Sequence, residues 1–272
     1  MSCVKNKKFQ HLVSALKGMR SILLAYSGGV DSTFLLKAVQ ASGVNALAVS
    51  ASSALIPSRE VQNARGIAKE LGVRHRIVDI DVLLSEEVAM NTPERCFFCK
   101  EMLFKELRGI AHTEAYEFIL DGGTRDDLNE FRPGRKASQI YGVRSPLMEA
   151  GYTKNEIREM SRLLGLATWD RASSPCLATR FPYGRRITIE ALRRVEMSES
   201  FLRTIGFRQL RVRDHGDSVR IEVTEEDMGL FLDPGKRTAI SAMLKSFGYL
   251  FISLDLDGYR SGSMDRVLKN IT

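Results

Sequence analysis

Apolar and polar residues along this chain follow two different periods. Apolar side chains recur about every three to four residues between Phe9 and Met19, which predicts an amphipathic first helix. Short apolar runs predict strands over 21–26, 45–51, 75–80 and 117–121. Helical spacing occupies the segments 32–42, 58–71 and 99–115. Strands that alternate with helices of this length predict an α/β fold with a mostly parallel sheet and helices on both faces.

After the last predicted strand of the sheet, one more helical pattern is followed by a segment without periodicity. A helix is predicted over 153–164, with Thr153 as its cap and Glu156 at the spacing of a capping box. Residues 165–187 show no periodicity, and a loop of this length inside a compact protein is usually functional or disordered.

From Thr188 onward the pattern predicts a smaller α+β unit. Its expected elements are a helix over 189–205, strands over 207–214 and 217–224, a helix over 235–246 and a strand over 248–254. His215-Gly216-Asp217 has the composition of a hairpin turn. We therefore predict two domains, residues 1–180 with the parallel sheet and residues 181–272 as a C-terminal domain for substrate binding and oligomerisation.

Composition narrows the class of protein. The chain has 272 residues, of which 44% are hydrophobic and 27% charged, as in ordinary globular proteins. No apolar run approaches the roughly 18 residues of a membrane helix, and no apolar stretch follows the basic N-terminus as in a secretory signal, so we expect a cytoplasmic protein without membrane contact. The net charge of +7 suits phosphorylated ligands and would also suit RNA, although its dispersal along the chain does not indicate nucleic acid. The alternative is a solvated basic surface.

A glycine-rich turn links the first strand to the next helix. It consists of Ser27, Gly28, Gly29, Val30, Asp31 and Ser32. Two glycines let the backbone turn sharply and bring N–H groups close to an anion, and the helix N-terminus adds partial positive charge. The ending Gly-Lys-Ser/Thr of the Walker loop is absent. The turn is therefore a candidate phosphate-binding loop of another kind, the alternative being a tight turn before a helix cap.

This hexapeptide resembles the PP-loop of ATP pyrophosphatases, which split ATP between its α and β phosphates and adenylate a substrate. The resemblance implies an adenine nucleotide alpha hydrolase-like sheet that binds ATP and Mg²⁺. Asp121-Gly122-Gly123-Thr124-Arg125-Asp126 follows the fourth strand and resembles the Asp-Gly-Thr segment of the same enzymes. Candidate ATP-binding residues there are Gly122, Thr124 and Asp126, whose carboxylate could hold Mg²⁺ or orient ribose, and the alternative is an ordinary turn. Ser50 marks the strand end where this fold would hold adenine, or is simply a strand end.

The four cysteines need separate interpretation. Cys3 lies near the terminus and is taken as an incidental thiol. Cys96 and Cys99 form a C-x-x-C, which suits a redox pair, half of a zinc site or part of an iron–sulfur site. Cys176 lies in the irregular segment. The three thiolates suit a [4Fe–4S] cluster with one open iron that can bind an extra sulfide, and the alternative is three small buried thiols.

The segment around Cys176 extends the resemblance along nearly the whole chain. Residues 173–184 read Ser-Ser-Pro-Cys-Leu-Ala-Thr-Arg-Phe-Pro-Tyr-Gly. Together with the hexapeptide, residues 95–100 (Arg-Cys-Phe-Phe-Cys-Lys) and Arg132-Pro133-Gly134, this segment resembles the LarE family of ATP-dependent sulfur transferases, which build the nickel-pincer nucleotide cofactor. The resemblance implies a small nucleotide substrate, pyridinium-3,5-biscarboxylic acid mononucleotide, whose carboxylates become thiocarboxylates. It also implies a homo-oligomer, a hexamer.

The residues that bind the substrate's phosphate and the source of the sulfur each have two alternatives. The substrate's phosphate needs a cationic clamp, for which Arg180, Arg211, Arg213 and Lys100 are candidates, although the arginines could equally be solvated surface. Family members take sulfur either from a sacrificed cysteine at the position of Cys176 or from a three-cysteine cluster supplied by a sulfide donor. Because Cys96 and Cys99 accompany Cys176, the sequence favours the cluster.

Three other functions use the same loop. A tRNA thiolase would bind RNA with a steep salt dependence. An ammonia-using synthetase would not need the three cysteines. A nucleotide sensor on the same fold would release no pyrophosphate.

Overall fold

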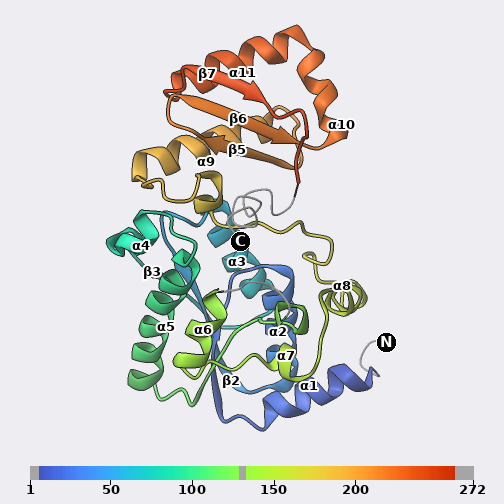
Figure 1. Cartoon of the computed structure of the whole chain (residues 1–272). Helices are drawn as coiled ribbons and strands as arrows, with labels where there is room; N and C mark the ends of the chain where they lie inside the picture. The colour runs from blue at the N-terminus through green and yellow to red at the C-terminus, as the bar shows by residue number, and fades with distance from the viewer. Residues whose placement is uncertain (1–5, 129–132, 261–272) are drawn as a thin grey trace. The chain divides into compact units, whose positions relative to one another are not determined.

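The computed structural model describes residues 6–128 and 133–260, so Cys3 and Arg132 lie outside the described residues. The chain divides into two compact units. The first contains the residues up to Val88 together with Glu94–Ser174, and the second contains Ala89–Pro93 and the residues from Pro175 onward (Figure 1). Along the described segments, no helix combines the length and apolarity needed to cross a membrane.

The first unit is built on a four-stranded parallel sheet. Its strands are β1 (Ser21–Ala25), β2 (Asn45–Ser52), β3 (His75–Asp79) and β4 (Phe118–Leu120), in the order β3-β2-β1-β4. All three strand pairs are parallel, which confirms the predicted α/β class. The chain runs from β1 to β2 and β3 on one side, whereas β4 lies on the other side of β1. The strand order therefore reverses between β1 and β4, where sheets of this kind bind ligands beyond the carboxyl ends of the strands.

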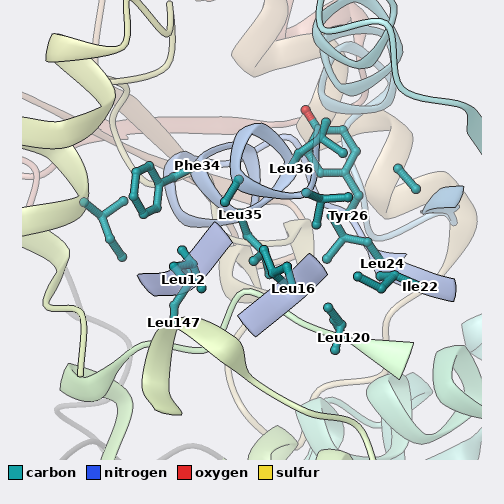
Figure 2. Packing of buried hydrophobic residues seen from close by; sticks show 14 of the residues in the cluster. Leu12, Leu16, Ile22, Leu24, Tyr26, Phe34, Leu35, Leu36, Leu120 and Leu147 are labelled. Atoms are coloured by element: carbon teal, nitrogen blue, oxygen red, sulfur yellow. The ribbon is translucent and has the colours of Figure 1, made fainter. Parts of the chain in front are cut away.

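Helices cover both faces of this sheet because successive side chains of a strand point to opposite faces. Ile22 and Leu24 pack into one core with Leu16 and Phe34 of the helices on that side (Figure 2). Leu23 packs into the opposite core with side chains of α5. The helices of this unit are α1 (Lys7–Lys17), α2 (Val30–Ser42), α3 (Ser58–Glu70), α4 (Glu86–Ala89), α5 (Arg95–Thr113), α6 (Pro133–Ile140), α7 (Pro146–Glu149) and α8 (Lys154–Leu163), with 3₁₀ turns at Val82–Leu84 and Arg125–Leu128.

The helix boundaries confirm the capping box and extend α5. The Thr153 hydroxyl accepts a hydrogen bond from the Glu156 N–H, and the Glu156 carboxylate accepts one from the Thr153 N–H. Helix α5 begins at Arg95, earlier than the predicted 99, so both cysteines of the C-x-x-C lie in its first turn. Helices α6 and α7 were not predicted.

The second unit contains the predicted small α+β arrangement. Strands β5 (Leu210–Asp214) and β6 (Ser218–Val223) form an antiparallel hairpin, whose turn includes Gly216 at φ +88°. Strand β7 (Phe251–Leu254) pairs parallel to β6. The sheet packs on α9 (Ile189–Thr204) and α11 (Pro234–Ser246) through a core that includes Leu202 and Leu244. Short elements are the 3₁₀ turns Leu177–Arg180 and Gly229–Leu232 and helix α10 (Glu225–Met228).

A five-residue segment, Ala89–Pro93, belongs to the second unit although it lies between β3 and α5 in sequence. The buried Asn91 amide donates to the carbonyl oxygens of Phe181 and Pro182, both at 2.9 Å. The Ile187 N–H donates to the Ala89 carbonyl at 2.7 Å. The chain enters the second unit again at Pro175, so the Cys176 segment belongs there, whereas we expected it at the end of the first domain.

Candidate functional site

The loop after β1 has the backbone of an anion cradle. Gly28 has φ +73°, a left-handed conformation that favours glycine. A Cβ at this position would lie 2.9 Å from the Cβ of Ala64 on α3, so the loop also packs closely against that helix. Gly29 caps α2, which begins at Val30 and carries Asp31 in its first turn. The N–H groups of the first turn of this helix therefore lie beside the loop.

The loop after β4 packs directly on the loop after β1. A Cβ on Gly122 would lie 3.2 Å from both the Cα and the N of Ser32, so any larger residue there would require Ser32 to move by a few tenths of an ångström. The Ser32 and Ser27 hydroxyl oxygens are 3.0 Å apart. The buried Asp121 carboxylate accepts hydrogen bonds from the Ser138 hydroxyl and the Gly123 N–H, both at 3.0 Å. The structure thus brings these two predicted segments together at the reversal of strand order.

Thr124 and Asp126 stabilise the loop after β4 through protein contacts. Thr124 is buried, and its N–H donates to the Asp127 carboxylate at 2.9 Å. The Asp126 carboxylate accepts a 2.7 Å hydrogen bond from the Lys154 N–H at the start of α8. These contacts hold the loop between the sheet edge and α8.

Ser50 connects the end of β2 to the start of the loop after β1. Its hydroxyl donates to the Tyr26 carbonyl at 2.6 Å and lies 2.8 Å from Nε2 of His75. Burial lowers the pKa of His75, and the charge of Arg65 acts in the same direction. The Tyr26 hydroxyl lies 3.3 Å from that of Thr33, and burial raises the pKa of Tyr26. A polar network therefore fixes the residue that precedes Ser27.

The C-x-x-C lies near the loop after β4. Cys96 is exposed and Cys99 half-buried in the first turn of α5. The next residue, Lys100, has its Nζ 3.6 Å from the Asp121 carboxylate, and a Cβ on Gly134 of α6 would lie 2.7 Å from its Cδ. Lys100 thus connects the cysteine-bearing turn with the loop after β4.

In the second unit, Arg180 holds the backbone at Cys176. Its side chain is fully buried, and its Nε and Nη2 donate to the Glu199 carboxylate at 2.8 and 3.1 Å. Its Nη1 donates to the carbonyl oxygens of Pro175 and Cys176 at 3.0 and 3.3 Å. Burial alone would raise the pKa of Glu199, but the nearby positive charges, first that of Arg180, lower it to about 2.

Arg213 and Arg211 gather at the same turn. Arg213 pairs with Glu222 at 2.9 and 2.6 Å and donates through Nη1 to the Thr179 carbonyl at 2.5 Å. Arg211 lies over the Tyr259 ring, and burial together with the charge of Arg180 lowers its pKa to about 10. The three predicted arginines are therefore buried together next to Cys176, and the alternative of a solvated surface is wrong.

Arg171 is a residue at the loop after β1 that sequence analysis missed. Its Nη1 donates to the Gly28 carbonyl at 3.3 Å and its Nη2 to the Glu60 carboxylate at 2.8 Å. It lies in the irregular segment before Cys176, where no periodicity marks individual side chains. The length of that segment was the available signal.

The cysteines of both units are thiols. Over residues 6–128 and 133–260, Cys96, Cys99 and Cys176 form no disulfide bond. Within the same ranges, no three His, Cys, Asp or Glu side chains are grouped so that they could hold a metal ion.

The parallel sheet and the Gly-Gly loop at its reversal point define a PP-loop protein of the ATP pyrophosphatase class. Residues 21–93 match the model of the queuosine biosynthesis protein QueC family. The chain is 38% identical to the pyridinium-3,5-bisthiocarboxylic acid mononucleotide synthase of Lactiplantibacillus plantarum, over 94% of this chain and 93% of that protein. The chain belongs to the LarE family of ATP-dependent sulfurtransferases.

Two further relatives differ in how much of the chain they cover. An uncharacterised protein of Synechocystis is 38% identical over 96% of this chain and 98% of its own length. The tRNA-specific 2-thiouridylase MnmA of Zymomonas mobilis is 27% identical, over 58% of this chain and 53% of its own length. The similarity to the tRNA thiolase is thus partial, whereas the similarity to the synthase is continuous.

Proposed function

We propose that this protein adenylates the carboxylates of pyridinium-3,5-biscarboxylic acid mononucleotide and converts them to thiocarboxylates. The observation that carries the proposal is the 38% identity to the L. plantarum synthase, which covers 94% of the chain and therefore both units. The loops after β1 and β4 support the ATP-dependent half of the reaction. Cys96, Cys99 and Cys176 support the sulfur-dependent half.

The loop and its neighbours account for activation of the substrate. A carboxylate resists nucleophiles because of its charge and because oxide is a poor leaving group, and transfer to AMP supplies a good one. The N–H groups at the start of α2 stabilise the departing pyrophosphate. Asp31 and Asp121 offer the carboxylate oxygens that Mg²⁺ prefers, and the ion when bound would neutralise phosphate charge.

We propose that Cys96, Cys99 and Cys176 are the ligands of a [4Fe–4S] cluster. The chemistry of the donors supports the proposal, because all three are thiols outside disulfide bonds and two of them share one helical turn, although the described structure does not group the three around a metal position. When bound, the cluster would supply sulfide as the nucleophile that displaces AMP, and an external donor would replenish it. The sacrifice of Cys176 as the sulfur source is the alternative within the family.

The two sulfur sources leave different products on the protein. Anaerobic reconstitution followed by iron counting should give about four irons per chain, lost in the Cys96→Ser and Cys99→Ser variants. The mass of Cys176 should be unchanged after turnover. An iron-free, active protein whose Cys176 loses about 34 Da, the mass of H₂S, would establish the sacrificial route instead.

The arginine cluster beside Cys176 is our proposed binding site for the phosphate of the substrate. Arg180, Arg211 and Arg213 bring three positive charges together, and guanidinium groups match phosphate oxygens. Glu199 and Glu222 orient Arg180 and Arg213, and we expect the three arginines to bind the phosphate together, with Lys100 as a further candidate. The Arg211→Gln variant should raise the KM for the nucleotide substrate and leave the KM for ATP unchanged.

The partial similarity to MnmA makes tRNA thiolation the second candidate. Filter binding of tRNA at several salt concentrations tests it directly. Tight binding with a steep salt slope would replace the nucleotide substrate by RNA, because each phosphate contact releases counterions. We expect weak binding, together with AMP release that depends on the pyridinium dicarboxylate.

We propose a homo-oligomer, a hexamer, as the assembled form. The second unit exposes the large apolar side chains of Leu250, Phe251 and Leu256, which are 61%, 67% and 90% exposed. Exposed apolar residues of this size often mark a protein contact. Light scattering of the purified protein should give six times the mass of one chain, and a monomer would contradict the proposal.

A further inference from the structure

We propose that Arg171 binds the pyrophosphate part of ATP, an inference that rests on the proposed adenylation reaction. The residue belongs to the first unit and donates to the phosphate-binding loop itself, at the Gly28 carbonyl. Its side chain keeps 24% of its surface exposed. A guanidinium has five N–H groups, so donors remain for an anion beyond the contacts to Gly28 and Glu60.

The phosphate-binding loop has no cationic side chain of its own. From Tyr26 to Ser32 it has one charged residue, and this is the acidic Asp31. The Walker loop has its own lysine at this place, which the present loop lacks. Backbone N–H groups supply only partial positive charge to a leaving group that carries several negative charges. Arg171 brings a full positive charge to the loop from the segment before Cys176.

Neighbouring residues hold both the guanidinium of Arg171 and the backbone that carries it. Glu60, in the first turn of α3, accepts from Nη2 at 2.8 Å and keeps 13% of its own side chain exposed. Arg158 of α8 donates to the carbonyl oxygens of Trp169 and Arg171, both at 2.9 Å, and so fixes the backbone that carries the side chain. A charged group that is oriented before the substrate binds loses little free energy in reorganisation when charge develops.

The role follows from the bond changes of adenylation. A carboxylate oxygen forms a bond to the α-phosphorus of ATP, and the bond from that phosphorus to the oxygen bridging the α and β phosphates breaks. The electron pair of the broken bond stays on pyrophosphate, whose charge therefore increases. A guanidinium at the Gly28 turn stabilises this charge, and AMP, which lacks the β and γ phosphates, does not use the contact.

Equilibrium binding of ATP and AMP to the full chain separates this role from a structural one. We expect Arg171→Gln to weaken ATP binding at least tenfold and to change AMP binding less than twofold. The ATP affinity of Arg171→Lys should lie between those of wild type and Arg171→Gln, because lysine keeps the positive charge but cannot donate two parallel hydrogen bonds as a guanidinium does. The matched control is Arg76→Gln, which breaks the exposed 2.6 Å pair with Glu114 at the outer strand β3. It should change neither affinity.

The outcomes are distinguishable. Equal affinities of Arg171→Gln and wild type for ATP overturn the inference, and so does an equal loss for ATP and AMP, which signals a distorted loop. If the glutamine variant does not fold, as judged by its melting temperature, the ATP-to-AMP ratio of the lysine variant decides. Failure of wild type to release AMP with the pyridinium dicarboxylate would instead refute the proposed function. The ATP and AMP affinities would still decide whether Arg171 binds the pyrophosphate part of ATP.

Discussion

Substitution of Gly28 by alanine tests whether the phosphate-binding loop depends on both its backbone conformation and its contact with α3. At φ +73°, an alanine costs about 1–2 kcal/mol relative to an ordinary backbone conformation. Its Cβ would also lie 2.9 Å from the Cβ and 3.0 Å from the Cα of Ala64. Because α3 or the loop must move to relieve this contact, overpacking adds about 1–3 kcal/mol.

Gly43 provides the matched control for this substitution. It ends α2 at φ +68°, and a Cβ there would meet nothing within 4 Å. Gly43→Ala should therefore lower the free energy of unfolding by about 1–2 kcal/mol, from the conformation alone. Gly28→Ala should lower it by about 2–5 kcal/mol and weaken ATP binding at least tenfold, since the loop is displaced.

Urea unfolding and ATP titration measure these differences. The midpoints and slopes give the free energies, and an unchanged slope shows that the same cooperative unit unfolds. Adding Ala64→Gly should recover part of the loss of Gly28→Ala, with a coupling free energy of about 1 kcal/mol in the double-mutant cycle. If Gly28→Ala costs no more than Gly43→Ala and ATP binding is unchanged, the reasoning about this loop is refuted.

Two further predictions concern buried ionisable groups. Glu199→Gln should lower the free energy of unfolding at pH 7 by about 3 kcal/mol, because the pKa of Glu199 falls from 4.5 to about 2 on folding. A depressed carboxyl pKa stabilises the fold above 4.5, so the difference measured by urea unfolding should shrink as the pH falls from 4.5 towards 2; a constant difference would contradict this cause. His75 has a pKa below its ordinary 6.5, so its stabilising effect is present above 6.5 and is lost as the pH falls through the lower folded value. Between pH 7 and 5 the free energy of unfolding should therefore fall less steeply in His75→Gln than in wild type. The same slope in both proteins would exclude His75 as a cause of this pH dependence.

The parts of the structure that depend on local chemistry were predictable from sequence. The capping box at Thr153 involves residues three apart and forms as expected. The hexapeptide at 27–32 also forms the predicted turn between the strand β1 and the helix α2. In these cases neighbouring residues decide the conformation.

The parts that depend on distant partners were not predictable. Pro133-Gly134 has the composition of a turn, yet it starts α6, where the buried Ala137 packs into the core beside α5. Arg180 is recognisable as a cation, but its burial depends on Glu199 of α9. Helical periodicity carries no information about such pairings, because each is set by tertiary packing rather than by the residue's neighbours in sequence.

The segment Ala89–Pro93 affects the order in which the chain can fold during synthesis. Asn91 leaves the ribosome long before Phe181 and Pro182, the residues whose carbonyl groups its amide contacts. The C-terminal unit therefore cannot be completed from a C-terminal fragment alone, and a fragment that ends at Ser174 leaves Asn91 with its amide unsatisfied by those partners. The second unit is thus completed only with a segment that is synthesised in the middle of the first.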